Sequence, residues 1–170
     1  MIDALREARK CEPSPTAFSV GCVLVAWYPT DDSVPLPLAR GHSRELPGNT
    51  HAEANALSKA MNVGSDPIYN SYPDVAMETL LRYTTVYTTL EPCSVRLSGL
   101  QSCTDKLIAA GVKRCVIGAP EPPDFVKCEG AQKLKEAGIE VVWFEKFQEE
   151  CIGIARNGAS KEIRDHGASY

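Results

Sequence analysis

Apolar runs of strand length alternate with segments of helical spacing along this chain of 170 residues. Runs rich in valine, isoleucine, threonine or aromatic residues favour strands. They predict buried strands over 20–27, 83–90, 113–118 and 139–144. After a predicted turn over 29–37, residues 38–42 return as the antiparallel partner of the first strand, which makes a hairpin with a long loop.

Helices are predicted where apolar residues recur every three or four positions. They cover 2–10, 50–64, 103–110, 130–137 and 148–156, with a shorter helix around 75–81. In the second helix Thr50 is the predicted N-cap, and Ala54, Leu57, Ala60 and Met61 are predicted to lie on one face.

The order of these elements predicts the fold class. A helix over 130–137 separates the last two strands, which implies a right-handed crossover and parallel pairing. Combined with the antiparallel hairpin, this pattern predicts an α/β protein, a three-layer α/β/α sandwich with a five-stranded mixed sheet.

Length and charge limit the function classes. A chain of this length can bury one core, so we expect a single domain over 1–170. The net charge of −4 argues against a broad surface for nucleic acid. No run approaches the ~20 apolar residues of a membrane span, and the start of the chain lacks a secretory signal. We therefore expect a cytoplasmic protein that binds neither nucleic acid nor membrane.

The cysteines predict thiols rather than disulfides. There are seven, an odd number, and Cys22 and Cys115 lie inside apolar runs where they act as small buried hydrophobes. We expect free thiols throughout, two of which are available to a metal.

Metal-ligating residue types gather in two short segments. One is Thr50-His51-Ala52-Glu53, and the other is Glu91-Pro92-Cys93, followed ten positions later by Cys103. One imidazole and two thiolates are the donors of a catalytic zinc site that leaves the fourth tetrahedral position to water. We therefore predict Zn²⁺ bound by His51, Cys93 and Cys103, with the carboxylate of Glu53 moving protons.

The helix starts allow this arrangement. On an ideal helix His51 and Glu53 diverge by about 200°, so both face one metal only if it lies off the N-terminal end. Cys103 also opens a helix, and a helix N-terminus lowers the pKa of a thiol. Glu53 has a second interpretation, because Thr50-x-x-Glu53 is also a capping box in which the glutamate bonds back to the cap residue.

The two segments together resemble the His-x-Glu and Pro-Cys…Cys signature of the zinc-dependent base deaminases. The chain is therefore similar to the cytidine deaminase superfamily. That resemblance implies a cytidine-deaminase-like fold and the hydrolytic removal of an amine from a ring. It also implies that Glu53 takes a proton from the attacking water, passes it to a ring nitrogen and helps ammonia to leave.

The spacing of the cysteines narrows the resemblance. Nine residues, 94–102, separate them, where nucleobase deaminases usually have two. This expansion resembles the riboflavin-pathway deaminases, as do the strand 20–23, the pair Glu121-Pro122 and the segment 134–141. The chain lacks the Asn-Pro pair and the His-Gly-Arg-Thr-Pro-Pro stretch of the bacterial bifunctional form, so it looks more like the fungal branch. On that resemblance the substrate is 2,5-diamino-6-ribitylamino-4(3H)-pyrimidinone 5'-phosphate, which loses its 2-amino group.

Five residues are candidates to contact such a substrate. A phosphorylated sugar chain needs cationic and hydroxyl donors, and Arg44, Arg96 and Ser98 flank the motifs. Asn49 is a candidate to hydrogen-bond the pyrimidine and Phe18 to stack on it. Each has an alternative, because loop arginines are often only solvated, Asn49 is a typical turn residue and Phe18 a typical core aromatic.

Other functions fit part of the pattern. A deaminase of free bases, nucleosides or tRNA shares the zinc motif, although the acidic charge counts against tRNA and the long loop against the compact nucleobase type. A catalytically inactive zinc-binding interaction module has no need of Glu53 and has four protein ligands, and no fourth is evident in the sequence. The superfamily resemblance also implies a homodimer.

Overall fold

The computed structural model describes residues 1–29, 34–62, 75–96, 98–122 and 128–157. One sheet has the order β2-β1-β3-β4-β5. Its strands are β1 (Gly21–Ala26), β2 (Leu36–His42), β3 (Thr84–Leu90), β4 (Arg114–Ala119) and β5 (Glu140–Trp143). β1 pairs antiparallel with β2 and β3, whereas β3, β4 and β5 run parallel. The predicted mixed sheet, its hairpin and its last parallel pair are therefore confirmed.

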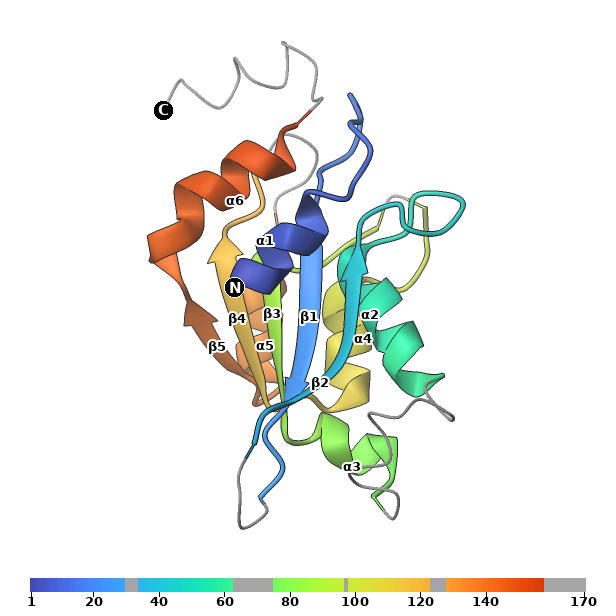
Figure 1. The fold of residues 1–170 in the computed structure, drawn as a ribbon, viewed down its shortest axis with the longest axis vertical. Helices are drawn as coiled ribbons and strands as arrows, with labels where there is room; N and C mark the ends of the chain where they lie inside the picture. The colour runs from blue at the N-terminus through green and yellow to red at the C-terminus, as the bar shows by residue number, and fades with distance from the viewer. Residues whose placement is uncertain (30–33, 63–74, 97, 123–127, 158–170) are drawn as a thin grey trace.

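Helices cover both faces of this sheet (Figure 1). On one face lie α1 (Ile2–Ala8) and α6 (Gln148–Ala155), and on the other α2 (Ala52–Met61), α4 (Cys103–Ala110) and α5 (Gly130–Glu136). The short α3 (Met77–Leu81) packs into the same core as α2, and a 3-10 turn (Glu145–Phe147) leads into α6. The predicted three-layer α/β/α sandwich is confirmed.

Each face of the sheet has its own core. The larger core joins strand residues to α2, α4 and α5 through Leu24, Val86, Ile117, Leu57, Leu107 and Leu134. The smaller core joins Leu5 of α1 and Cys151 of α6 to Leu90 and Ala119, the last residues of β3 and β4. Burial on both faces explains why β3 is nearly all buried and reads as a continuous apolar and threonine run.

The helix α2 differs from its prediction. His51 is its N-cap instead of Thr50, because the Thr50 hydroxyl accepts a hydrogen bond from Leu46 N at 3.3 Å and does not cap. The face that carries Ala54, Leu57, Ala60 and Met61 is only partly buried, since Met61 is 51% exposed and Ala54 half-buried. Its buried positions are Ala52, Glu53, Asn55, Ala56, Leu57 and Ala60. The predicted end near residue 64 lies outside the described residues.

The strand β2 begins inside the predicted turn, at Leu36 instead of Leu38. It is an edge strand, where Pro37 is tolerated, and the register with β1 shifts between Leu24 and Val25. Residues 30–33 of the predicted turn lie outside the described part of the chain.

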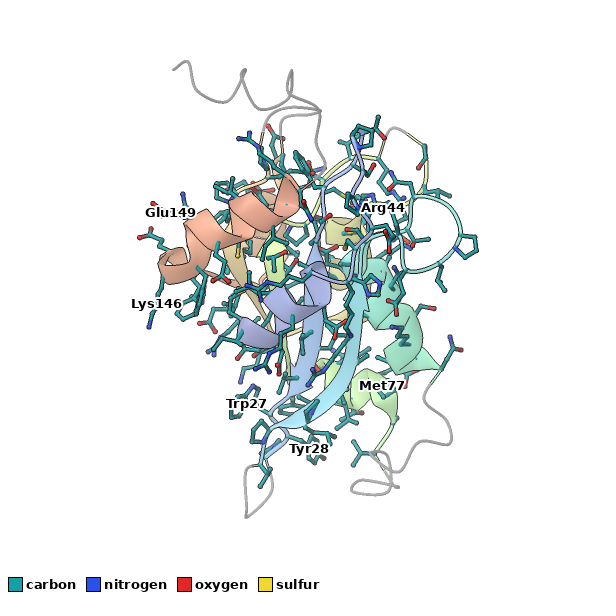
Figure 2. The ribbon with its side chains drawn as sticks, turned by 45° about the horizontal axis from the view of Figure 1, so that its top comes forward. Trp27, Tyr28, Arg44, Met77, Lys146 and Glu149 are labelled. Atoms are coloured by element: carbon teal, nitrogen blue, oxygen red, sulfur yellow. The ribbon has the colours of Figure 1, made fainter. Side chains whose placement is uncertain are left out.

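The functional residues gather at one edge of the sheet. β3 and β4 end there, at Leu90 and Ala119, and β1 begins there. Arg44, which follows β2, lies at this end of the molecule, while Trp27 and Tyr28 lie at the opposite end (Figure 2). Ligand sites in open α/β sheets typically lie outside the carboxyl ends of parallel strands.

Candidate active site

His51, Cys93 and Cys103 come together as predicted from the motifs. Their ligand atoms lie within 4.8 Å of one another. His51 Nδ1 is 3.4 Å from Cys93 Sγ and 3.5 Å from Cys103 Sγ. Zinc bonds of ordinary length at tetrahedral angles place a nitrogen and a sulfur about 3.6 Å apart. The three side chains therefore fit a tetrahedral zinc ion.

Backbone placement brings the three ligands together. His51 is the N-cap of α2 and Cys103 the first residue of α4, where Ser102 caps the helix by accepting from Asp105 N at 3.1 Å. Cys93 lies just beyond β3, and its Sγ accepts a hydrogen bond from Cys103 N at 3.4 Å. Two helix N-termini thus meet a strand end, and their dipoles favour thiolate sulfur at this point.

The two thiols do not share the same protonation preference. A hydrogen bond from the Cys103 thiol, aided by His51, holds the pKa of Cys93 well below its ordinary value. The same bond together with burial raises the pKa of Cys103. A dication between the sulfurs deprotonates both, which suits this donor set to zinc.

Glu53 lies beside the ligands and is not a capping residue. It is 3% exposed and lines the same pocket as His51 and Cys93. Burial raises the pKa of its carboxyl. Its Oε1 accepts a hydrogen bond of 2.9 Å from the Thr88 hydroxyl of β3. Since α2 begins after His51, the capping-box interpretation with Thr50 is wrong.

Helix α5 is docked directly on the turn that carries Cys93. Glu91 Oε1 accepts from Ala131 N at 2.8 Å, and Ser94 Oγ accepts from Glu129 N at 3.1 Å. A Cβ on Gly130 would lie 1.9 Å from the Pro92 carbonyl oxygen. Only glycine permits this approach, so the turn and the helix hold each other in place.

The pocket in front of the ligands has a volume of about 200 Å³. Four of the five predicted substrate contacts line it, namely Phe18, Asn49, Arg96 and Ser98. Phe18 also belongs to the smaller core. Its position therefore fits a core aromatic as well as a residue that stacks on the substrate. The lining residues to which the sequence analysis gave no role include Thr16, Ser43, Glu91 and Glu121.

Arg44, a predicted phosphate contact, is not among the residues that line the pocket. Its guanidinium donates to the carbonyl oxygens of Phe18 at 2.8 Å and Glu12 at 2.7 Å, and to Ser19 Oγ at 3.1 Å. The backbone N–H of Arg44 donates to the backbone oxygen of Thr50 at 2.7 Å. Arg44 therefore ties the segment 12–19 to the loop that precedes α2, and both contribute to the pocket walls.

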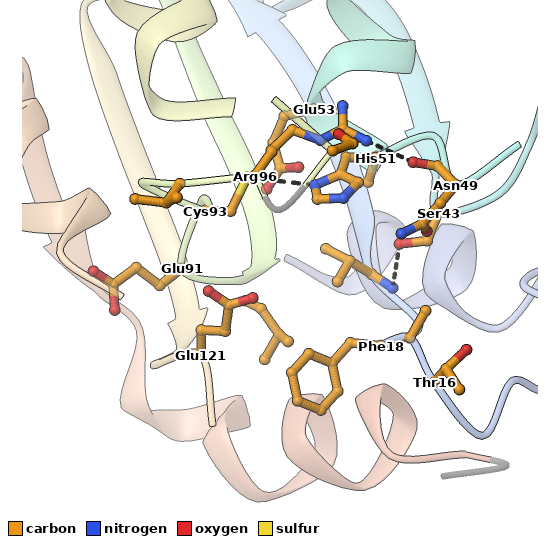
Figure 3. Close-up of a pocket in the computed structure, with 16 residues that line it drawn as sticks. Thr16, Phe18, Ser43, Asn49, His51, Glu53, Glu91, Cys93, Arg96 and Glu121 are labelled. Carbon is orange, nitrogen blue, oxygen red and sulfur yellow. Dashed lines mark hydrogen bonds between the residues drawn. The ribbon is translucent and has the colours of Figure 1, made fainter. Parts of the chain in front are cut away.

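Arg96 spans the mouth of the pocket. Its Nη2 donates to the backbone oxygen of Asn49 at 2.7 Å, so the inter-cysteine loop reaches the loop before α2. Figure 3 places Arg96 above His51, with Asn49 beside it. A guanidinium has five N–H donors, and one bond leaves others for an anion.

Glu121 follows β4 and is the most informative lining residue that lacked a sequence role. Burial raises the pKa of its carboxyl to about 7. Its Oε2 is buried and has no hydrogen-bond partner among the described residues. It lies near Phe18, apart from Arg96 and Asn49 (Figure 3). The available signal was its position at the end of a strand parallel to the one that leads to Cys93.

The other cysteines match their prediction. All seven are free thiols, and Cys22 and Cys115 are fully buried.

Within the described residues, His51, Cys93 and Cys103 form the one group of metal-ligating side chains close enough to hold an ion. None of the described helices has the length and apolar character needed to cross a bilayer.

A family model for the cytidine and deoxycytidylate deaminase zinc-binding region matches residues 1–119. The chain belongs to this deaminase family. It is 42% identical over 158 residues to the diaminohydroxyphosphoribosylamino-pyrimidine deaminase of Schizosaccharomyces pombe, which covers 93% of this chain and 34% of that protein. It is 33% identical over 145 residues to the riboflavin biosynthesis protein RibD of Escherichia coli, or 83% of this chain and 32% of that protein. The deaminase chain thus spans about a third of these curated relatives.

Solved structures agree with this family. The Rib2 deaminase of Aspergillus oryzae matches with a TM-score of 0.78 at 30% identity, over 96% of this chain and 92% of that one. The same enzyme in complex with DARIPP matches with a TM-score of 0.77 at 29% identity, over 96% and 91%. A dCMP deaminase of cyanophage S-TIM5, at 21% identity and a TM-score of 0.53 over 84% and 92%, shares the fold.

Proposed function

We propose that this deaminase releases ammonia from 2,5-diamino-6-ribitylamino-4(3H)-pyrimidinone 5'-phosphate in riboflavin biosynthesis. One observation carries the chemistry: nitrogen–sulfur separations of 3.4 and 3.5 Å that suit zinc, with a buried glutamate on the same pocket. The substrate class is supported by the identity to the S. pombe deaminase and by the likeness to the Rib2 deaminase in complex with DARIPP.

In this proposal, His51, Cys93 and Cys103 hold the zinc ion. When bound, zinc makes water acidic enough to react near neutral pH. Glu53 takes a proton from the attacking water and returns it to the ring nitrogen beside the amine. Glu53 then passes the remaining proton of that water to the amine, which leaves as ammonia while the ring carbon becomes a carbonyl. A raised pKa suits Glu53 because the carboxyl must hold the proton between these transfers.

The remaining pocket residues suit a phosphorylated pyrimidine. Arg96 and Ser98 offer donors to the phosphate or the sugar chain, and Asn49 offers an amide to the ring. Phe18 supplies an apolar surface for the ring, and Glu121 Oε2, which has no hydrogen-bond partner among the described residues, accepts from a ring or amino N–H.

We also infer that the protein is a cytoplasmic homodimer and that residues 1–170 form a single deaminase domain. The homodimer rests on the superfamily resemblance, and the single domain is supported by the five-stranded sheet with cores on both faces. Light scattering on the purified chain tests the dimer, and a monomer at micromolar concentration contradicts it.

Ammonia release from the zinc-loaded protein tests the substrate. The ribityl and ribosyl forms of the diaminopyrimidinone phosphate are compared with cytosine, cytidine and guanine. We expect turnover of the ribityl form at least tenfold above all others. Preference for the ribosyl form keeps the pathway but reverses the sugar. Turnover of a base or nucleoside alone overturns the pathway assignment.

A further inference from the structure

Glu53 belongs to α2, but its carboxylate is hydrogen-bonded to a residue of the sheet. Thr88, in the middle of β3, donates its hydroxyl to Glu53 Oε1 at 2.9 Å. Thr88 is 0% exposed and Glu53 3% exposed, so water does not compete freely for this bond. The bond joins α2 to the central strand at the point where the proposed proton transfers occur.

Thr88 is itself firmly placed. β3 is a central strand, and Thr88 is in register with Cys22 of β1 on one side and Ile117 of β4 on the other. A β-branched side chain on a strand has restricted χ1, so its hydroxyl direction is largely set by the backbone. A glutamate side chain is flexible by comparison and gains a defined orientation from such a partner.

We propose that Thr88 is a positioning residue that orients Glu53 for proton transfer, an inference that rests on the proposed function. With Oε1 accepting from Thr88, the travelling proton resides on Oε2. The same oxygen then serves the water, the ring nitrogen and the leaving amine in turn. Thr88 gains and loses no proton in the reaction.

The neighbouring Thr89 provides a matched control. It is also 0% exposed, and its hydroxyl accepts from Gly21 N of β1 at 3.1 Å. Successive side chains of a strand point to opposite faces, so Thr89 is directed away from Glu53. Both substitutions to valine remove one used, buried hydroxyl from the same strand, but only one of those hydroxyls contacts Glu53.

Steady-state kinetics of the zinc-loaded variants test the proposal. We expect Thr88→Val to lower kcat about 10- to 100-fold, the range for a lost hydrogen bond to a charged group. KM and the bound zinc, measured by mass spectrometry of the metal, should stay within about twofold, since Thr88 does not line the pocket. Thr88→Ser should restore kcat, and Thr89→Val should retain it while lowering the melting temperature.

Other outcomes overturn the inference. An unchanged kcat in Thr88→Val, or an equal loss in Thr89→Val, gives Thr88 no special role. If Thr88→Val does not fold, Thr88→Ala carries the same test. Crystal structures of the variants supply a readout independent of turnover, namely whether the Glu53 carboxylate rotates away. If the wild type releases no ammonia from either pyrimidinone phosphate, the proposed function fails, and the Glu53 orientation still decides the role of Thr88.

Discussion

The metal-facing edge of the site (His51, Glu53, Cys93 and Cys103) and its outer wall (residues 16–18, 43–49, 95–96 and 98) are built differently. Side chains of the edge sit at helix starts or just beyond a strand, and Cys103 is 0% exposed. The outer wall consists of loops, and Val95 within it is 54% exposed. The hydrogen bonds that its arginine side chains make go largely to backbone oxygens. The edge is ordered by secondary structure, whereas the wall is ordered by contacts between loops.

The largest expected effect concerns the edge. Glu53→Gln keeps the shape and can still contact Thr88 but cannot accept a proton, so kcat should fall about 10²- to 10⁴-fold. Zinc content should remain at one ion per chain, because Glu53 is not among the three ligands. Loss of zinc together with activity would instead make Glu53 part of the metal site. Ammonia release and metal analysis on the same sample separate the two outcomes.

The wall should respond in stability as well as in binding. Arg44→Met removes three side-chain hydrogen bonds that join two loops, and should lower the free energy of unfolding by about 1–3 kcal/mol while raising KM. Arg96→Met removes one exposed bond and should change stability by less than about 0.5 kcal/mol, yet raise KM if Arg96 binds phosphate. Denaturant unfolding and kinetics on both variants make the comparison. Equal stability of the two variants would contradict the role of Arg44 as a tie between loops.

Glu121 belongs to both regions, because it follows a strand but faces the pocket. Its pKa is about 7 in the folded protein and near 4.5 in the unfolded chain, so the folded state binds this proton more tightly. The stability contributed by Glu121 is therefore full below pH 4.5 and is lost as the pH rises through 7. Glu121→Gln removes this loss and should gain about 1 kcal/mol over the wild type between about pH 5 and 8, since the side chain is only partly buried.

Thermal unfolding of the zinc-loaded proteins across that pH range measures the difference. Glu149→Gln, an exposed carboxylate of α6, is the control and should run parallel to the wild type. A parallel course for Glu121→Gln as well would show that Glu121 is not a buried acid in solution.

The metal-facing edge could be predicted from the sequence better than the outer wall. The helix α4 was predicted with its observed bounds, because Ser102 caps it and Gly111, at φ 67°, ends it, and both signals are local. The cluster of His51, Cys93 and Cys103 was predictable because the spacing of these residues reflects element ends. The contacts of Arg44 were not predictable, since its partners Glu12, Phe18 and Ser19 lie 25 to 32 residues away.

Two further differences have physical causes of the same kind. Threonine is a common N-cap residue, but the Thr50 hydroxyl accepts a hydrogen bond from Leu46 N. The N-cap is therefore His51. Glu121 reaches the pocket through the parallel pairing of β3 with β4, which follows from the order of the elements and not from the residues around Glu121. Sequence reasoning thus succeeded where one element sets a side chain and failed where the placement depends on distant segments.

Because Gly130 has no side chain, helix α5 can pack closely enough to help fix the positions of Cys93 and Cys103. Any larger residue there would push against the Pro92 carbonyl, next to Cys93, and against the Thr104 hydroxyl, next to Cys103. Cys93 and Cys103, two of the three proposed zinc ligands, would then shift together. In a mutational screen, substitutions at position 130 would therefore abolish activity as substitutions of a catalytic residue do. Gly130 contributes no reactive group, and its role is to leave room for the close contact between α5 and the Cys93 turn.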